Sequence, residues 1–249
     1  MRKNILAPAP IVCEGKRASE FVNCFRGYPG VVLGNSPSIG MVNLKLLDPF
    51  ISIGVNRILR AYSSHFVMFC DTRIPIEEES DFKRYAGRFL IYDKLRSWKG
   101  KLSSEDNVYF WSLNGKKGRG DSAVTGTDTF YTCGTTPGYA IQLMQYWGMN
   151  PIAVLGVDFN APQLGSKNKD SHFYGEGKKF KSNGGGNFDG YKKEFYVWFR
   201  TMCEKSGTEV YNLSPIKDSP FSIGSGYTMM SVEEFSNKYV GKMLGVANV

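Results

Sequence analysis

Several clusters of small polar residues follow apolar runs of the chain, and their residue types suit the binding of an anion. The first cluster, GNSPS (34–38), comes directly after the run VVL. Gly34 lets a ligand approach the backbone, Asn35 offers an amide, and Ser36 and Ser38 offer hydroxyls. A strand, a turn and a helix start in this order favour a phosphate site, although an ordinary capped turn has the same pattern.

The second cluster, TCGTTPG (132–138), precedes a predicted helix. The hydroxyls of Thr135 and Thr136 could cradle a phosphate or a ribose there, or one of them could cap the helix. The third cluster is GVDF (156–159), at the end of the most apolar strand. At that place Asp158 could take a ribose hydroxyl, a metal or a proton, or it could cap the following loop.

The fourth cluster is DSHFYG (170–175), in which His172 lies in a polar loop. A histidine titrates near neutral pH, so His172 is our candidate general base for a hydroxyl group. Lys167 and Lys169 could hold a phosphate beside it, although a solvated surface is the usual place for such a run. Asp71, which follows the run FVMFC, is a further candidate for the site.

The elements that must position these clusters alternate along the chain. Apolar runs of strand length predict strands at 30–34, 51–55, 66–70, 88–92, 107–111, 152–159 and 209–213. Apolar residues at helical spacing predict helices at 138–147, 191–205 and 231–243. This alternation predicts an α/β fold with a mostly parallel sheet, whose functional residues lie at the carboxyl ends of the strands.

The domain prediction is an N-terminal arm over 1–25, followed by one nucleotide-binding domain over 26–249. Two segments, 116–129 and 162–190, are rich in glycine, lysine and serine and do not fit the alternation. Both are predicted to be mobile loops over the site.

Composition excludes several classes of protein. The chain has 249 residues, 42% of them hydrophobic and 22% charged, which is a globular balance. No apolar run approaches the roughly 20 residues of a membrane helix. The net charge of +8 favours a phosphate-rich partner, or it serves solubility alone. Five scattered cysteines argue against a disulfide framework and a zinc site, and they favour the cytoplasm.

Taken in order, five strings resemble the bacterial CMP-sialic-acid-dependent sialyltransferases: GNSPS, ISIGVN, TT, GVDF and SHFYG. The later string YNLSP also matches, so the resemblance covers about Gly30 to Pro215. The strings equally resemble the wider superfamily, which includes the archaeal 6-hydroxymethylpterin diphosphokinase-like proteins. The resemblance implies a Rossmann-like domain, with helices on both faces of the sheet and a flexible lid-like insertion.

The resemblance also implies roles for individual residues. Asn35 and Asn56 would contact the nucleotide and phosphate of a donor, and His172 and Asp158 form the predicted catalytic pair. Asn160 stands where the sialyltransferases carry a phosphate-binding tyrosine, so Lys167, Lys169 or Tyr174 would stabilise the leaving phosphate. The full predicted nucleotide- and donor-binding set is Gly34, Asn35, Ser36, Ser38, Asn56, Asp71, Thr135, Thr136 and Gly156.

The predicted function is an inverting glycosyltransferase that uses a nucleotide-activated sugar donor and needs no metal or other cofactor. The acceptor would be a glycan or another hydroxyl compound, and a nucleic-acid acceptor stays open because the chain is basic. One alternative is a pterin diphosphokinase-like transferase in which Asp71 and Asp158 hold Mg²⁺ on a triphosphate. Another alternative is a protein that binds or modifies nucleic acid.

Overall fold

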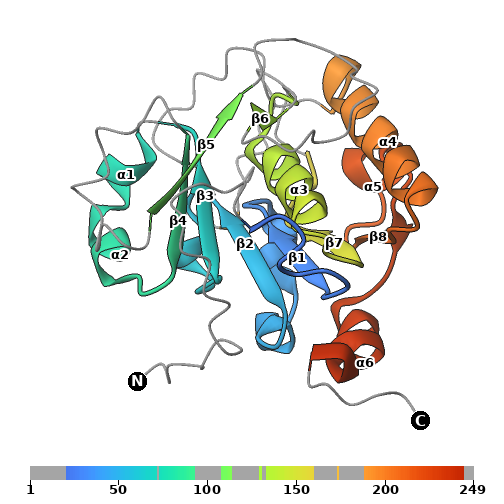
Figure 1. Ribbon diagram of the computed structural model, residues 1–249, viewed down its shortest axis with the longest axis horizontal. Helices are drawn as coiled ribbons and strands as arrows, with labels where there is room; N and C mark the ends of the chain where they lie inside the picture. Colours follow the sequence, from blue (N-terminus) through green and yellow to red (C-terminus); the bar gives the residue numbers. More distant parts are fainter. Residues whose placement is uncertain are drawn as a thin grey trace.

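The computed structural model describes residues 21–71, 73–92, 108–113, 129–130, 133–159, 173 and 188–243. Nine strands form one sheet in the order β6-β5-β4-β3-β2-β1-β7-β8-β9, and every neighbouring pair is parallel (Figure 1). The strands are β1 Gly30–Leu33, β2 Ile51–Val55, β3 Phe66–Phe69, β4 Arg88–Tyr92, β5 Val108–Leu113, β6 Thr129–Phe130, β7 Ile152–Leu155, β8 Val210–Asn212 and β9 Thr228–Met229.

The central strands are apolar on both faces because helices cover both faces. In β1, Val32 belongs to one hydrophobic cluster, while its neighbours Val31 and Leu33 belong to the other. In β7, Val154 and Ala153 divide between the same two clusters. Successive side chains of a strand point to opposite faces, so a continuous apolar run is what a doubly covered strand requires.

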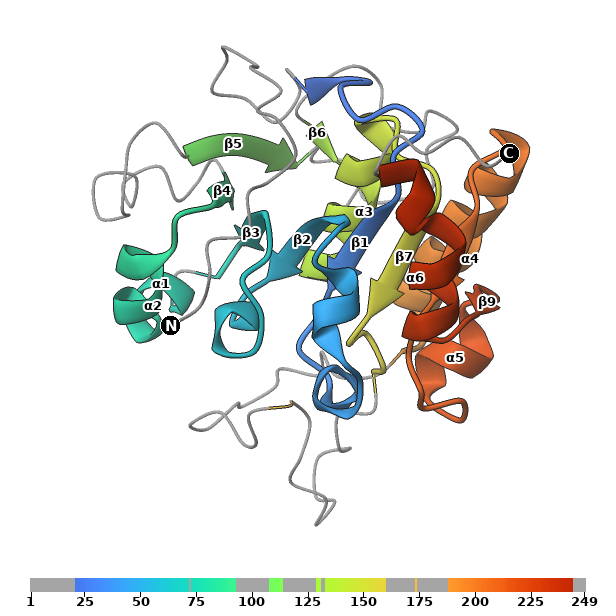
Figure 2. The ribbon, with the colours of Figure 1, turned by 90° about the horizontal axis from the view of Figure 1, so that it is seen from below.

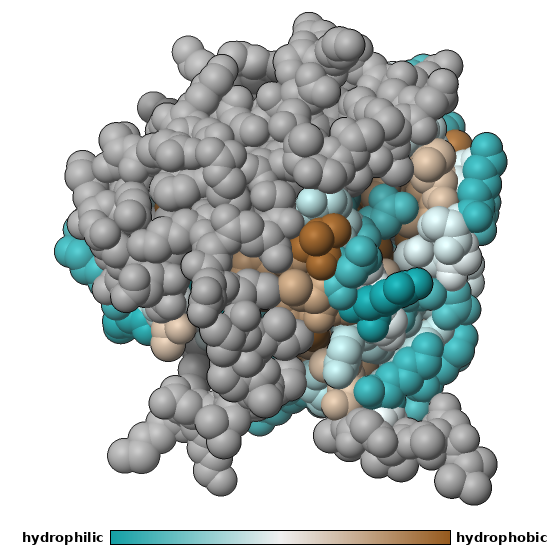
Figure 3. Space-filling model, viewed as in Figure 1, coloured by the Kyte–Doolittle hydropathy of each residue, from teal (hydrophilic) through white to brown (hydrophobic). Residues whose placement is uncertain are grey.

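Helices α3 (Thr136–Tyr146) and α4 (Gly190–Lys205) cover the first face (Figure 1). Helix α3 begins at Thr135, whose hydroxyl caps the amide of Gly138, and the chain leaves it through Gly148 at φ +80°. Helix α4 is amphipathic, with exposed charged residues such as Lys193, Glu194 and Glu204 on its outer side. The described surface seen in this view carries both hydrophilic and hydrophobic residues (Figure 3). Its apolar stripe, which includes Phe195 and Phe199, lies in the core.

The second face is covered by α1 (Ile74–Glu77), α2 (Glu79–Arg84), α6 (Val232–Met243) and three 3₁₀ turns, η2 (Pro37–Met41), η3 (Leu44–Leu47) and η4 (Ile58–Arg60) (Figure 2). Helix α6 begins with a capping box, because Ser231 and Glu234 each accept the backbone amide of the other. The short helix α5 (Pro220–Gly224) contributes Phe221 to the first core.

The predicted fold class is confirmed: the protein has a Rossmann-like α/β fold with a parallel sheet and helices on both faces. Phe21 and Phe25, in the last residues of the predicted N-terminal arm, pack with Phe66 and Trp147 as part of the first core. Of the two predicted mobile loops, 116–128, 162–172 and 174–187 lie outside the described residues. None of the described helices has the length and apolar character needed to cross a bilayer.

Candidate functional site

The order of the strands changes direction between β1 and β7. From β1 the chain adds strands β2 to β6 toward one edge of the sheet, and it then returns to place β7 against the other side of β1. Crevices at such a switch point, at the carboxyl ends of the strands, are where open α/β sheets bind ligands. GNSPS follows β1 and GVDF follows β7, so two of the predicted clusters meet at this point.

Gly34 and Gly156 bring the two strand ends into direct backbone contact. The amide of Gly34 donates to the carbonyl of Leu155 at 2.7 Å, and the amide of Ser36 donates to the carbonyl of Gly156 at 2.9 Å. A Cβ atom on Gly34 would overlap the Gly156 carbonyl group, and Gly156 has a φ of +74°. Glycine is therefore required at position 34 by the close contact and at position 156 by the backbone conformation.

Asp158 holds the loops after β1, β7 and β8 together. Its carboxylate accepts the backbone amide of Ser38 at 3.2 Å and the hydroxyl of Ser214 at 2.7 Å. Its own amide donates to the hydroxyl of Ser36 at 3.1 Å. The side chain is completely buried, and both carboxylate oxygens have protein donors. In this arrangement Asp158 fixes the loops at the β1/β7 switch point relative to one another.

Asn35 connects the ends of β1 and β2. Its side-chain amide donates to the carbonyl of Val55 at 2.8 Å, and its backbone carbonyl accepts the amide of Phe173 at 3.0 Å. Because Nδ2 is committed to a carbonyl, Oδ1 is the free end of the side chain. This oxygen is buried and has no hydrogen-bond partner in the described part of the chain.

Two more buried oxygens without partners lie near Asn35, also after the carboxyl ends of the strands. They are Ser38 Oγ, in the turn after β1, and Asn56 Oδ1, directly after β2. Across the described residues, five buried side-chain atoms have no hydrogen-bond partner, and three of these are at this edge. Buried polar groups are nearly always hydrogen-bonded, so three atoms without partners at one end of the strands are an unusual concentration within the described residues.

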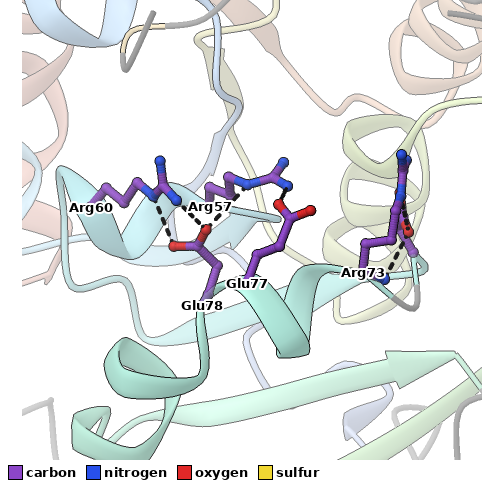
Figure 4. A network of polar contacts seen from close by, with 6 residues as sticks. Arg57, Arg60, Arg73, Glu77 and Glu78 are labelled. Carbon is purple, nitrogen blue, oxygen red and sulfur yellow. Dashed lines mark hydrogen bonds and ion pairs between the residues drawn. The ribbon is translucent and has the colours of Figure 1, made fainter. Parts of the chain in front are cut away.

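Asp71 is engaged by Arg73 at the end of β3. Arg73 donates to it from Nε and Nη2 and from its backbone amide (Figure 4). These hydrogen bonds, first of all those from the guanidinium, lower the pKa of the Asp71 carboxyl below its ordinary value. Asp71 therefore carries a negative charge that an arginine already neutralises.

The Mg²⁺ alternative needs Asp71 and Asp158 on one ion, and the residues do not fit it. Strands β3 and β7 are three strand spacings apart, about 14 Å at 4.8 Å each, whereas oxygen ligands lie about 2.1 Å from Mg²⁺. Both carboxylates also have protein partners. Within the described ranges, no group of three or more histidine, cysteine or acidic side chains could hold a metal ion.

The predicted threonine pair lies at the start of α3, and its hydroxyls have internal partners. Thr135 Oγ1 accepts the amide of Gly138 at 3.2 Å and lies 2.9 Å from Tyr196 Oη. Thr136 Oγ1 lies 3.3 Å from Cys70 Sγ. Helix capping, one of the two interpretations of this cluster, therefore accounts for Thr135.

Four predicted site residues, His172, Lys167, Lys169 and Tyr174, lie outside the described residues. Their roles stay predictions. Phe173, which stands between His172 and Tyr174 in the sequence, is described, and its amide binds the carbonyl of Asn35.

Two groups of residues at this edge were not predicted. Ser214 belongs to the YNLSP string that the sequence singles out, but its contact with Asp158 depends on the strand order. Arg57, Arg60 and Glu78 form a network of ion pairs next to Asn56 (Figure 4). Glu78 is separated from Arg57 by an intervening strand, and no local pattern in the sequence marks such a pair.

No protein-family model matches the chain, and the search of curated proteins found no match. The fold is similar to solved structures of the sialyltransferase CstII from Campylobacter jejuni. For the CstII structure with cytidine-5'-monophosphate, the TM-score is 0.48 and the sequence identity is 10%. The match covers 82% of this chain and 86% of that one. For the CstII structure with CMP-3FNeuAc, the TM-score is 0.49 and the sequence identity is 9%, and the match covers 83% of this chain and 88% of that one. A TM-score below 0.5 marks a loose likeness, so the function proposed below depends on this chain's own residues.

Proposed function

We propose that the protein is a glycosyltransferase that takes a sugar from a nucleotide-activated donor bound at the β1/β7 switch point. The observation that carries this proposal is the group of three buried oxygens without partners, on Asn35, Ser38 and Asn56. The switch point of a parallel sheet is also the general place for nucleotides in such folds.

The chemistry of these three oxygens favours a nucleotide. Asn35 Oδ1 can only accept a hydrogen bond, so its ligand must present a donor such as a ribose hydroxyl or the exocyclic amine of a base. Ser38 Oγ is both a donor and an acceptor, which suits a phosphate oxygen or a sugar hydroxyl. The order of motifs resembles that of CMP-sugar-dependent enzymes, which makes CMP the first probe to use.

The proposed reaction is an in-line displacement at the anomeric carbon with inversion. His172 would take the proton of the acceptor hydroxyl, because a histidine titrates near neutral pH. Support for this role is the hydrogen bond that ties the next residue, Phe173, to Asn35. Lys167, Lys169 or Tyr174 would stabilise the departing nucleotide.

The proposal uses no metal, because Arg73 already neutralises Asp71 and Asp158 is bound by Ser38 and Ser214. Asp158 would act by holding the loop that carries Ser38. The acceptor is a glycan or another hydroxyl compound, with a nucleic acid as an open alternative because of the +8 charge. The proposed location is the cytoplasm, supported by the free thiols of the four described cysteines.

The test is a thermal-shift and calorimetric titration with CMP, UDP and ATP, each with and without Mg²⁺. CMP at 100 times its dissociation constant should stabilise the wild type by about 2.7 kcal/mol, or roughly 5–11 °C. Asn35→Ala should weaken CMP binding about tenfold or more, because it removes a hydrogen-bond acceptor that the proposed ligand would use.

The matched control is Asn150→Ala. Asn150 also donates to one carbonyl, that of Gly207, and accepts one amide, that of Glu209, but it lies at the amino end of β7. Its loss should leave CMP binding unchanged. A shift with ATP and Mg²⁺ alone would favour the diphosphokinase alternative, and salt-sensitive binding of single-stranded nucleic acid without any nucleotide shift would favour the third. Either result would overturn the proposal.

A further inference from the structure

We propose that Glu78 is a positioning residue for the nucleotide site, which it serves by fixing the turn that carries Asn56. This inference rests on the proposed function, because it assigns Asn56 to the ligand. The carboxylate of Glu78 is itself paired with Arg57 and Arg60. Its effect on a ligand would therefore pass through the backbone between β2 and η4.

One carboxylate joins both ends of the turn η4. Glu78 Oε1 accepts Arg57 Nε at 3.1 Å, and Arg57 is the residue that precedes η4. The same carboxylate accepts Arg60 Nε at 2.8 Å and Arg60 Nη2 at 2.5 Å, and Arg60 is the last residue of η4 (Figure 4). Glu77 also contacts Arg57 through Nη2. The carboxylate of Glu78, the residue before α2, thus holds the side chains at both ends of η4, those of Arg57 and Arg60.

The other side of the turn is packed against β2. A Cβ atom on Gly54 would overlap the side chain of Ile58 and would lie 2.6 Å from Ser64 Oγ. The turn therefore cannot move closer to the strand, and the ion pairs with Glu78 prevent it from moving away. Between these two constraints, the chain leaves β2 in one fixed direction.

Asn56 is the residue at which that direction changes. It has a φ of +51°, in the left-handed region that asparagine tolerates better than most residues. Its backbone amide donates to the carbonyl of Met68 at 2.9 Å, so its main chain is anchored to β3. Arg57 is the next residue, so the tie to Glu78 acts on the peptide group that orients the Asn56 side chain.

The burial of this network argues that its geometry matters more than its contribution to stability. The side chain of Glu78 is 2% exposed and that of Arg57 is 10% exposed. Removing two charges from water costs about as much as their attraction returns, so apolar residues of similar size would stabilise the fold equally well. Hydrogen-bonded ion pairs depend on direction, whereas apolar contacts do not. A directional contact can hold the Asn56 amide in one orientation.

The experiment measures CMP binding by calorimetry in a double-mutant cycle of Glu78→Gln and Asn56→Gly. Glycine keeps the left-handed backbone and removes the amide. Each single variant should weaken binding about tenfold, the effect of losing one well-placed hydrogen bond. In the Asn56→Gly background, Glu78→Gln should cause no further loss, because no amide remains to be positioned.

Glu209→Gln is the matched control. Glu209 accepts hydrogen bonds from Tyr211 and Tyr239 and pairs with Lys238, but it lies at the amino end of β8. The Glu209→Gln substitution removes a carboxylate from a comparable network, and the affinity for CMP should not change. Arg60→Gln, which removes the tie from Arg60 to Glu78 and keeps Arg57 in place, provides a second variant if Glu78→Gln does not fold. It should weaken CMP binding in the same direction and by less.

The outcomes separate the two proposals. If the wild type does not bind CMP, the proposed function fails and this inference fails with it. If the wild type binds CMP and Asn56→Gly weakens binding, the proposed site stands. The positioning role is then overturned if Glu78→Gln binds like the control, or if its effect is the same with and without the Asn56 amide.

Discussion

The buried carboxylate of Asp158 makes the sharpest stability prediction. Asp158→Ala would leave the amide of Ser38 and the hydroxyl of Ser214 buried without their acceptor. Hydrogen bonds to a charged group contribute about 1.5–3 kcal/mol each, so the two together give at least about 3 kcal/mol. For a chain of this size that is a fall in Tm of roughly 6–12 °C. Asp158→Asn keeps one acceptor oxygen and should lose about half as much.

Urea denaturation followed by far-ultraviolet circular dichroism measures this loss, provided that the m value stays unchanged. Asp218→Ala is the control, because it deletes an exposed carboxylate from the loop that follows Ser214, and it should change the free energy of unfolding by no more than about 0.5 kcal/mol. Ser214→Ala should destabilise the wild type more than it destabilises Asp158→Ala. A loss below about 1 kcal/mol in Asp158→Ala would refute the view that this residue holds the three loops together.

Two further predictions concern the frame around the site. Gly34→Ala should lower the free energy of unfolding in urea by about 1–3 kcal/mol, because the added Cβ would overlap the Gly156 carbonyl. The control is Gly40→Ala, whose Cβ meets nothing within 4 Å and should leave the stability unchanged. Equal stabilities of the two variants would contradict the close contact. Burial, followed by a nearby arginine, lowers the pKa of His65 from 6.5 to about 4. The unfolded chain therefore binds the extra proton between these values, and up to about 3 kcal/mol of stability should be lost as the pH falls from 6.5 to 4. His65→Gln should flatten the unfolding free energy in that window, and an unchanged profile would show that His65 is not its source.

The central sheet could be predicted from the sequence because its strands are buried on both faces. The strands β2 and β7 are buried throughout and consist mostly of apolar residues, and the predicted bounds differ from the structure mainly at the ends. The helices α1, α2 and α5 were not predicted, since each is four to six residues long and buries few apolar side chains. The two-residue strands β6 and β9 are likewise too short to leave a pattern.

Only those residues of the candidate site that a local sequence pattern marks could be predicted. Asn35 and Asp158 follow apolar strands, and this position alone places them at the carboxyl edge of the sheet. Which groups already have partners depends on contacts between distant segments. Thr135 pairs with Tyr196, and Asp158 pairs with Ser214. These partners depend on the order of the strands and on the packing of α4, and neither can be predicted from a single motif.

The contact between Gly34 and Gly156 has a consequence for how such a site can change. The contact between the ends of β1 and β7 at Gly34 and Gly156 is made by peptide groups. Substitutions cannot reshape a surface made of main chain without separating the strands. At the proposed nucleotide site, selectivity would therefore come from side chains such as those of Asn35, Ser38 and Asn56.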